Sequence, residues 1–145
     1  MDGKYNLSER LIDFAVVILK ISAKFPKTIA ANHIAGQIVR SGTAPALHYG
    51  EAQAAESSKD FIHKMKVALK ELRETFNGLR ISRKMLWLPD EEFVWAIDEN
   101  NQLISIFYKS IETAKKNNAN KNKTRNPASK KYDNQNGENI LSDQQ

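Results

Sequence analysis

The stretch from Ser57 to Trp87, SSKDFIHKMKVALKELRETFNGLRISRKMLW, holds the longest clean helical pattern in the chain. Apolar side chains recur along it every three or four residues, the spacing that brings side chains to one face of an α-helix. Ser57 is followed three residues later by Asp60, which is typical of a helix N-cap. We therefore predict a helix from about Ser58 to Trp87. Its expected core stripe is Phe61, Met65, Ala68, Leu72, Phe76 and Leu79.

Three further helices are predicted around this one. The first runs from about Asn6 to Lys24, because the residue before Pro26 avoids the α region. The second runs from about Thr28 to Ala55, and the fourth from the turn at Pro89 to about Lys115. No segment alternates between apolar and polar residues over a useful length, so no sheet is expected. The predicted fold class is all-α, with four helices.

Small residues dominate the second predicted helix. Gly36 and Gly42 each cost a helix about 1 kcal/mol relative to alanine, so we expect close helix packing to compensate. Pro45 lacks the N–H that would bond to Ser41. The sequence therefore predicts either a kink in this helix or two helices that meet between Gly42 and Pro45.

The first predicted helix is apolar on two faces. One face holds Leu11, Phe14, Ala15, Ile18, Ser22 and Phe25, and the other holds Ile12, Val16, Leu19 and Ala23. A helix that is apolar on both sides is buried on both sides. In a domain of four helices, the second face suggests a contact between subunits.

Composition changes after residue 115. Residues 1–115 contain 16 Lys and Arg against 14 Asp and Glu, so this part is nearly neutral. Residues 116–145 contain six Lys and Arg against three Asp and Glu, together with eight Asn. We predict a four-helix bundle over residues 1–115 and a disordered basic tail over residues 116–145, because the tail has too few apolar residues to bury.

Compartment and chemistry are constrained by what the sequence lacks. The chain has no cysteine, and no apolar run approaches the about 20 residues of a membrane span. We expect a cytoplasmic protein without membrane association. His48 and Glu51 are three residues apart, but one His and one Glu are too few for a metal site. With no Glu-x-x-His and no phosphate loop, we expect neither an enzyme nor a cofactor.

One edge of the third predicted helix carries a row of mainly basic residues. Their spacing alternates between four and three residues, which keeps them on one edge. The members are Lys59, His63, Lys66, Lys70, Arg73, Asn77, Arg80 and Lys84. Such a row can follow a phosphate backbone. A solvated helix face is the alternative, because Glu71 and Glu74 are close in sequence and Lys70 and Glu74 have the i, i+4 spacing of an ion pair.

Three segments resemble a known family. They are QIVRSGTAPALHYGEA at residues 37–52, Lys59-Asp60-Phe61, and LKELRET at residues 69–75. Together with Phe25-Pro26 they resemble the bacterial four-helix-bundle protein family, also called the 23S rRNA-intervening-sequence protein or S23 family. The resemblance covers about residues 5–115. It implies an up-down four-helix bundle that assembles as a ring, typically a homopentamer.

The resemblance also suggests partners and residue roles. The accessory protein of diversity-generating retroelements has a similar fold and binds nucleic acid and a reverse transcriptase. By position, Arg40, Glu51 and Glu71 are expected to form a polar network that holds the kink of the second helix against the third. Two functions remain open. One is a non-catalytic homo-oligomer that binds RNA or DNA non-specifically through the basic row. The other is an assembly scaffold for a protein partner such as a reverse transcriptase.

Overall fold

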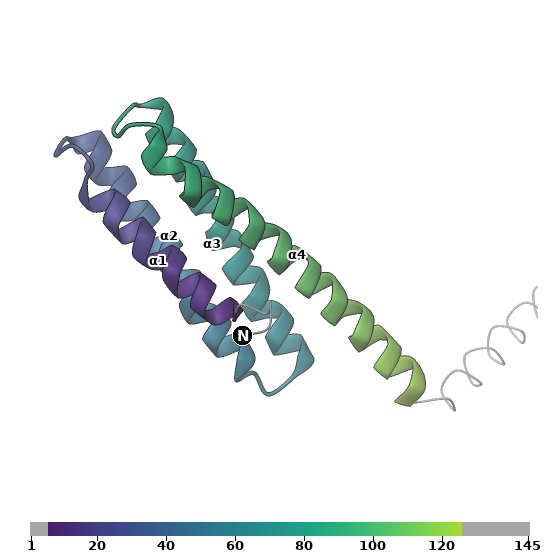
Figure 1. The fold of residues 1–145 in the computed structure, drawn as a ribbon. Coiled ribbons are helices and arrows are strands. Elements are labelled where there is room, and N and C mark those ends of the chain that lie inside the picture. Colours follow the sequence, from purple (N-terminus) through teal and green to yellow (C-terminus); the bar gives the residue numbers. More distant parts are fainter. Residues whose placement is uncertain (1–5, 126–145) are drawn as a thin grey trace, which may run out of the picture. The chain divides into compact units, whose positions relative to one another are not determined.

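The protein is a bundle of four α-helices, seen in a computed structural model that describes residues 6–125. The helices are α1 (Leu7–Ala23), α2 (Ile29–Gln53), α3 (Ser58–Lys84) and α4 (Glu91–Arg125), and residues 6–125 contain no strand. Successive helices run up and down beside one another (Figure 1). The predicted all-α four-helix bundle is confirmed. A compact unit ends at Ile111, and the part of α4 from Glu112 onward belongs to a second unit.

Side-chain caps begin the first three helices. Asn6 Oδ1 accepts a hydrogen bond from the Ser8 amide at 2.9 Å, and Ser57 Oγ accepts one from the Asp60 amide at 3.0 Å. The Thr28 hydroxyl accepts from the Ala31 amide at 3.2 Å. Each cap satisfies one of the first N–H groups of its helix, which have no carbonyl partner inside the helix. The predicted starts of these helices are therefore correct to within about a residue.

A tight turn ends α3 at Lys84 rather than at Trp87 as predicted. The Trp87 amide donates to the Ser82 carbonyl and the Leu86 amide to the Arg83 carbonyl, which is the Schellman pattern. Leu86 takes the left-handed conformation that this motif needs, with φ of 57°. The Trp87 ring then packs 5.3 Å from the Phe25 ring, centroid to centroid. The turn is held by hydrogen bonds and this contact, neither of which helical periodicity reveals.

Helix α2 is continuous through Pro45, which lies inside it. The alternative of two helices meeting between Gly42 and Pro45 is therefore wrong, whereas the kink itself stays a prediction. Pro45 is buried. The helix tolerates the missing hydrogen bond because it is packed on both sides of this position, where Gly42 and Ala52 are buried.

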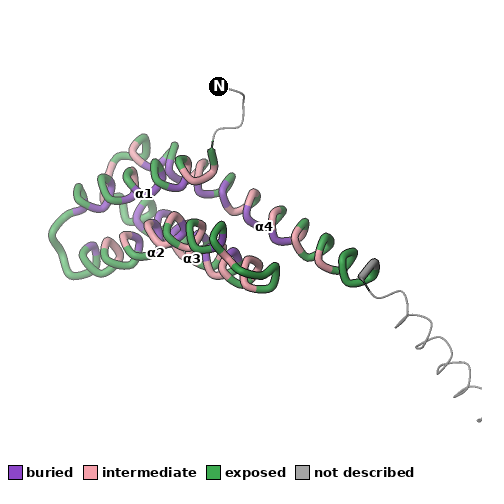
Figure 2. The backbone as a smooth tube through the Cα atoms, turned by 90° about the horizontal axis from the view of Figure 1, so that it is seen from below, coloured by how far each residue is buried: buried purple, intermediate pink, exposed green. Residues whose placement is uncertain are grey.

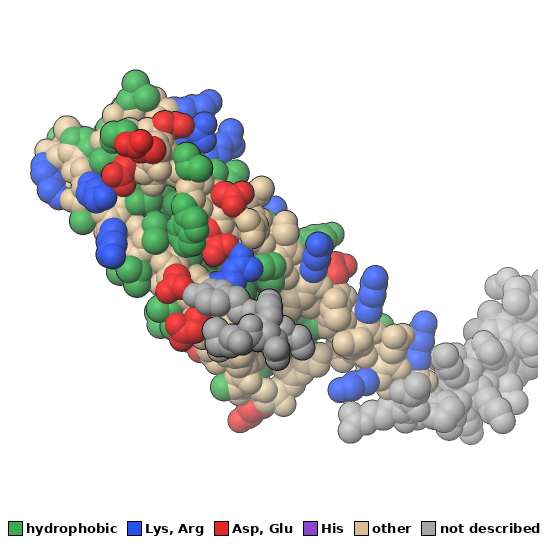
Figure 3. Space-filling view, viewed as in Figure 1, with side chains coloured by type: hydrophobic (Ala, Val, Ile, Leu, Met, Phe, Trp, Pro, Cys, Tyr) green, Lys and Arg blue, Asp and Glu red, His purple; other side chains and the backbone are tan. Residues whose placement is uncertain are grey.

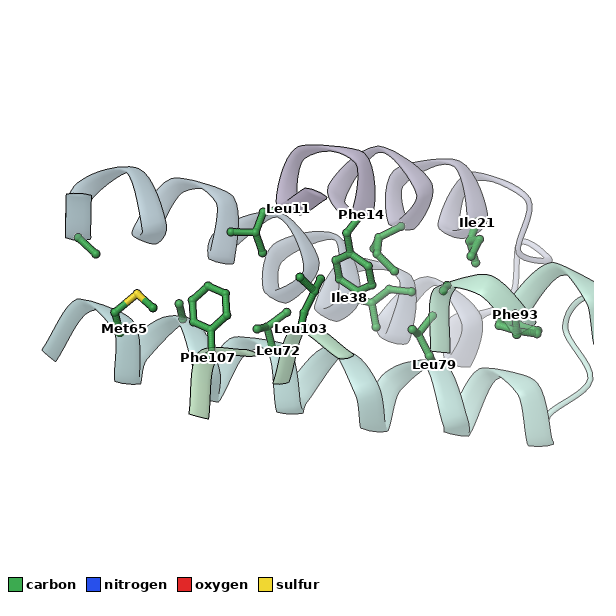
Figure 4. Close-up of a cluster of buried hydrophobic side chains, with 14 of the residues drawn as sticks. Leu11, Phe14, Ile21, Ile38, Met65, Leu72, Leu79, Phe93, Leu103 and Phe107 are labelled. Atoms are coloured by element: carbon green, nitrogen blue, oxygen red, sulfur yellow. The ribbon is translucent and has the colours of Figure 1, made fainter. Parts of the chain in front are cut away.

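The hydrophobic core receives side chains from all four helices (Figure 4). Buried and exposed positions alternate along α1, α2 and α3, as one buried face per helix requires (Figure 2). The first predicted face of α1 is buried, and so are Met65, Ala68, Leu72 and Leu79 of α3. The second face of α1 is exposed: Ile12, Val16 and Leu19 have relative exposures of 44%, 41% and 44%.

Two glycines let helices approach closely. A Cβ on Gly42 of α2 would lie 2.8 Å from Cγ2 of Ile18 in α1, and one on Gly78 of α3 would overlap Cγ2 of Ile38 in α2. The close packing predicted at Gly42 is confirmed. The prediction for Gly36 is wrong, because a Cβ there would meet nothing within 4 Å.

Helix α4 extends ten residues beyond its predicted end at Lys115, to Arg125. The prediction of disorder is therefore wrong for residues 116–125, and residues 126–145 lie outside the described part of the chain. The Lys-, Asn- and Ala-containing segment includes neither Gly nor Pro before Pro127, so nothing in it breaks a helix that has already begun. No helix between residues 6 and 125 combines the length and apolar character needed to span a membrane.

Candidate nucleic-acid interface

The basic row is an exposed edge of α3. The name denotes Lys59, His63, Lys66, Lys70, Arg73, Asn77, Arg80 and Lys84, all of which lie within Ser58–Lys84 and are exposed. The core stripe of the same helix occupies the opposite side, so burial of that stripe determines which way the row points. The structure thus brings together every site residue that the sequence predicted for nucleic-acid binding.

Basic side chains of this row have no acidic partner within residues 6–125. The ion pairs of the described residues join Arg10 to Glu99, Lys24 to Glu92, Arg40 to Glu71 and Glu74, Lys64 to Glu51, Arg83 to Asp90, and Lys115 to Glu112. None of them includes a member of the row, and His48 pairs with Glu51 within α2. The row therefore keeps its full positive charge along the helix.

Glu71 and Glu74 point toward α2 and not toward the row. The Arg40 guanidinium bonds to Glu74 at 2.8 Å and to Glu71 at 3.1 Å. The hydrogen bond with Glu74 and the charge of Glu71 raise the pKa of Arg40 above its usual range. Glu74 pairs with Arg40, and the pair with Lys70 that the i, i+4 spacing allows is not formed.

The predicted network of Arg40, Glu51 and Glu71 is divided into two separate contacts. Glu51 bonds to Lys64 of α3 at 3.1 Å, and its carboxylate lies 3.8 Å from Nδ1 of His48. The hydrogen bond from Lys64 lowers the pKa of Glu51, and the same contact raises the pKa of Lys64. Arg40 and Glu51 are eleven residues apart on one helix, about 16 Å along its axis, which is too far for one network.

Two of the hollows that open along the C-terminal half of the row exceed 300 Å³. One has a volume of about 310 Å³ and is lined by Arg73, Phe76, Asn77, Asn101 and Ile104. The other, of about 380 Å³, is lined by Asn77, Arg80, Ile81 and Lys84. The Arg80 guanidinium lies over the Phe76 ring at 5.7 Å from its centroid. This contact limits the freedom of Arg80 and leaves its N–H groups available at the surface.

Sequence reasoning missed the contribution of α4. Asn101 borders the first hollow, and the preceding residue, Asn100, is fully buried and donates to the Leu72 carbonyl at 3.0 Å. The sequence signal that could have indicated this contribution is Asn100 itself, a polar residue at a core position of α4 between the apolar residues Ala96 and Leu103.

The opposite surface has a different character. Figure 3 shows the face formed by α1 and α4, where acidic, basic and hydrophobic side chains are interspersed over α1 and the first part of α4, and mainly basic side chains follow along the C-terminal part of α4. Interspersed charges attract a polyanion weakly, because attraction and repulsion largely cancel. The basic row of α3 differs from the mixed part of this face because its members form no ion pair with the described acidic residues.

These features define the class of protein: an all-α, up-down four-helix bundle with an exposed basic edge on its third helix. Within this class, the chain belongs to the 23S rRNA-intervening sequence protein family, whose model matches residues 4–109. The match confirms the family that the sequence motifs indicated.

A solved structure has the same fold. It is a protein with unknown function from the S23 ribosomal protein family of Bacteroides thetaiotaomicron. The two chains are 25% identical, with a TM-score of 0.65, and the match covers 73% of this chain and 98% of the other. Among curated proteins, none matches this sequence significantly.

Proposed function

We propose that this protein is a non-catalytic, homo-oligomeric four-helix bundle of the cytoplasm that binds RNA or DNA through the basic row, without sequence preference. The observation that carries the proposal is the row itself, whose members are all exposed and have no acidic partner among the described residues. Its first and last members are 25 residues apart, which corresponds to about 38 Å of helix. A rigid line of charges of this length can neutralise several phosphates at once.

The composition of the row explains why binding is expected to be non-specific. Four of its members are Lys, whose ammonium group attracts phosphate as a point charge and reads no base edge. Binding through phosphates releases counterions, so affinity falls steeply as salt is raised. The row lies on a regular helix anchored in the core, so its charges are in place before the ligand arrives.

Charge reversal within the row tests this function. Changing Lys66, Lys70 and Arg73 to Glu should weaken binding of a generic RNA at least about tenfold at 0.1 M salt, and should reduce the slope of log affinity against log salt by about 2–3. The matched control changes Lys20, Lys27 and Lys109 to Glu, three exposed residues outside the row with the same change in net charge. Fluorescence anisotropy at two salt concentrations measures both quantities. Equal affinity of wild type, row variant and control would contradict the proposal.

Homo-oligomerisation is supported by the exposed apolar face of α1, which consists of Ile12, Val16 and Leu19. A second copy of the chain, repeated around a ring such as a pentamer, would remove these side chains from water. The same face also favours the alternative function, a scaffold that docks a protein partner such as a reverse transcriptase. If that alternative is correct, reversing the charge of the row should leave binding of the protein partner unchanged.

A further inference from the structure

The hollow between α3 and α4 differs in chemistry from the rest of the basic row. Arg73 and Asn77 of α3 line it together with Asn101 of α4, and all three are exposed. The half-buried side chains of Phe76 and Ile104 complete the lining. None of the described residues that line it is acidic. It therefore combines one cation, two amides and an apolar surface in a volume of about 310 Å³.

Each lining group complements one part of a ribose–phosphate unit. The planar guanidinium of Arg73 can bind a phosphate through two parallel N–H groups. The amides of Asn77 and Asn101 each offer donors and an acceptor, and a ribose 2′-hydroxyl is itself both donor and acceptor. The volume is at the lower end of the roughly 300–1,000 Å³ of small-ligand sites, which suits one nucleotide unit rather than a folded domain.

We infer that this hollow takes a ribose–phosphate unit of RNA and that it makes the protein bind RNA more tightly than DNA of the same sequence. The inference rests on the proposed function, since the row must first bring the polyanion to α3. Deoxyribose lacks the 2′-hydroxyl, so the two amides would stay hydrated when DNA binds. The row supplies affinity for either nucleic acid, and the hollow adds the preference for RNA.

The test compares three single-stranded probes of one mixed sequence without self-complementarity: RNA, 2′-fluoro RNA and DNA. The 2′-fluoro probe retains the sugar pucker of RNA but has no hydroxyl donor, so it separates recognition of the hydroxyl from recognition of shape. Wild-type protein should bind RNA about fivefold more tightly than either other probe, the contribution expected of a single neutral hydrogen bond. Anisotropy at constant salt measures the three dissociation constants.

Variants of the hollow test whether it is the source of the preference for RNA over DNA. Changing both Asn77 and Asn101 to Ala should remove the RNA preference, so that the variant binds RNA and DNA of the same sequence with equal affinity. Asn32→Ala, at an exposed asparagine of α2, is the matched control and should retain the preference. Circular dichroism checks that each variant remains helical.

The outcomes separate this inference from the proposed function. Equal wild-type binding of RNA and DNA, with both weakened by charge reversal of the row, would overturn the RNA preference and leave the proposed function standing. A preference that survives in the double variant would equally overturn the role of the hollow. Failure to bind any probe would overturn the proposed function, and this inference with it.

Discussion

Two glycines inside helices differ in what lies opposite them. A Cβ at Gly78 would overlap Cγ2 of the buried Ile38, and a β-branched side chain in a helix has nearly one allowed χ1 rotamer, so Ile38 cannot turn away. Overpacking costs about 1–3 kcal/mol, of which better helix propensity returns about 1 kcal/mol. We expect Gly78→Ala to lower the free energy of unfolding by up to about 2 kcal/mol, measured by urea denaturation.

Gly36→Ala is the matched control, because a Cβ there meets nothing within 4 Å. It should raise the free energy of unfolding by about 0.5–1 kcal/mol through helix propensity alone. If the two alanine variants proved equally stable, the close approach of α2 and α3 at Gly78 would be wrong.

Leu86 carries backbone strain at the end of α3. Its φ of 57° lies in the left-handed region, which costs a residue with a Cβ about 1–2 kcal/mol. The side chain is 83% exposed, so little packing is lost when it is removed. Leu86→Gly should therefore raise the free energy of unfolding by about 1 kcal/mol. Leu86→Ala keeps the Cβ and should give no such gain, and thermal denaturation of the two variants distinguishes them.

At the scale of elements, exposed ion pairs join α2 to α3. The pKa of Glu51 is lowered mainly by the hydrogen bond from Lys64 and to a smaller extent by His48. A carboxylate whose pKa is lower in the folded than in the unfolded state stabilises the fold above its unfolded pKa. That stabilisation is lost as pH falls through its folded pKa. The Glu51–Lys64 contact should therefore stabilise the fold fully above the usual glutamate value of 4.5, and this contribution should be lost as the pH falls through the lowered pKa of Glu51.

Lys64→Gln tests this pH dependence. The variant should be slightly less stable than wild type at pH 7, and the difference should vanish on acidification below the folded pKa of Glu51. Urea denaturation of both proteins across that range measures the difference, in which other titrating groups cancel. A difference that persists at low pH would mean that Lys64 acts by packing and not by charge.

Helix starts and helix ends differed in how well the sequence predicted them. The starts were correct because Asn6 and Ser57 bond to amides two or three residues away, so the signal is local. The ends were less accurate. Helix α3 ends where Trp87 reaches Phe25, which lies in the connection between α1 and α2, so this contact joins distant residues. Helix α4 continues because no residue stops it, although its apolar content has fallen.

At the scale of the whole molecule, the exposed face of α1 predicts self-association. Light scattering of the wild type should give a mass several times the 16.5 kDa of one chain. Val16→Glu places a charge in the centre of the apolar face and should reduce this mass, because burying an unpaired charge is costly. Lys27→Glu, an exposed change outside α1, should leave it unaltered. A wild-type mass near 16.5 kDa would exclude the ring.

The fold and the row could be predicted from sequence, because helical periodicity alone sets which residues share a face. The row at Lys59 to Lys84 is such a periodic set, and its exposure follows from burial of the opposite stripe. The family motifs indicated the same four-helix fold.

Tertiary structure decided which partner each polar residue meets. The i, i+4 spacing allows an ion pair between Lys70 and Glu74. In the structure, α2 packs against α3 so that Glu74 pairs with Arg40 and Glu51 pairs with Lys64. The hollow at Arg73 includes Asn101, 28 residues further along the chain. Local sequence determines the faces of a helix because they depend on neighbouring residues. Ion pairs and hollows between helices depend on the rotation and axial position of two distant segments, which packing of the complete core determines.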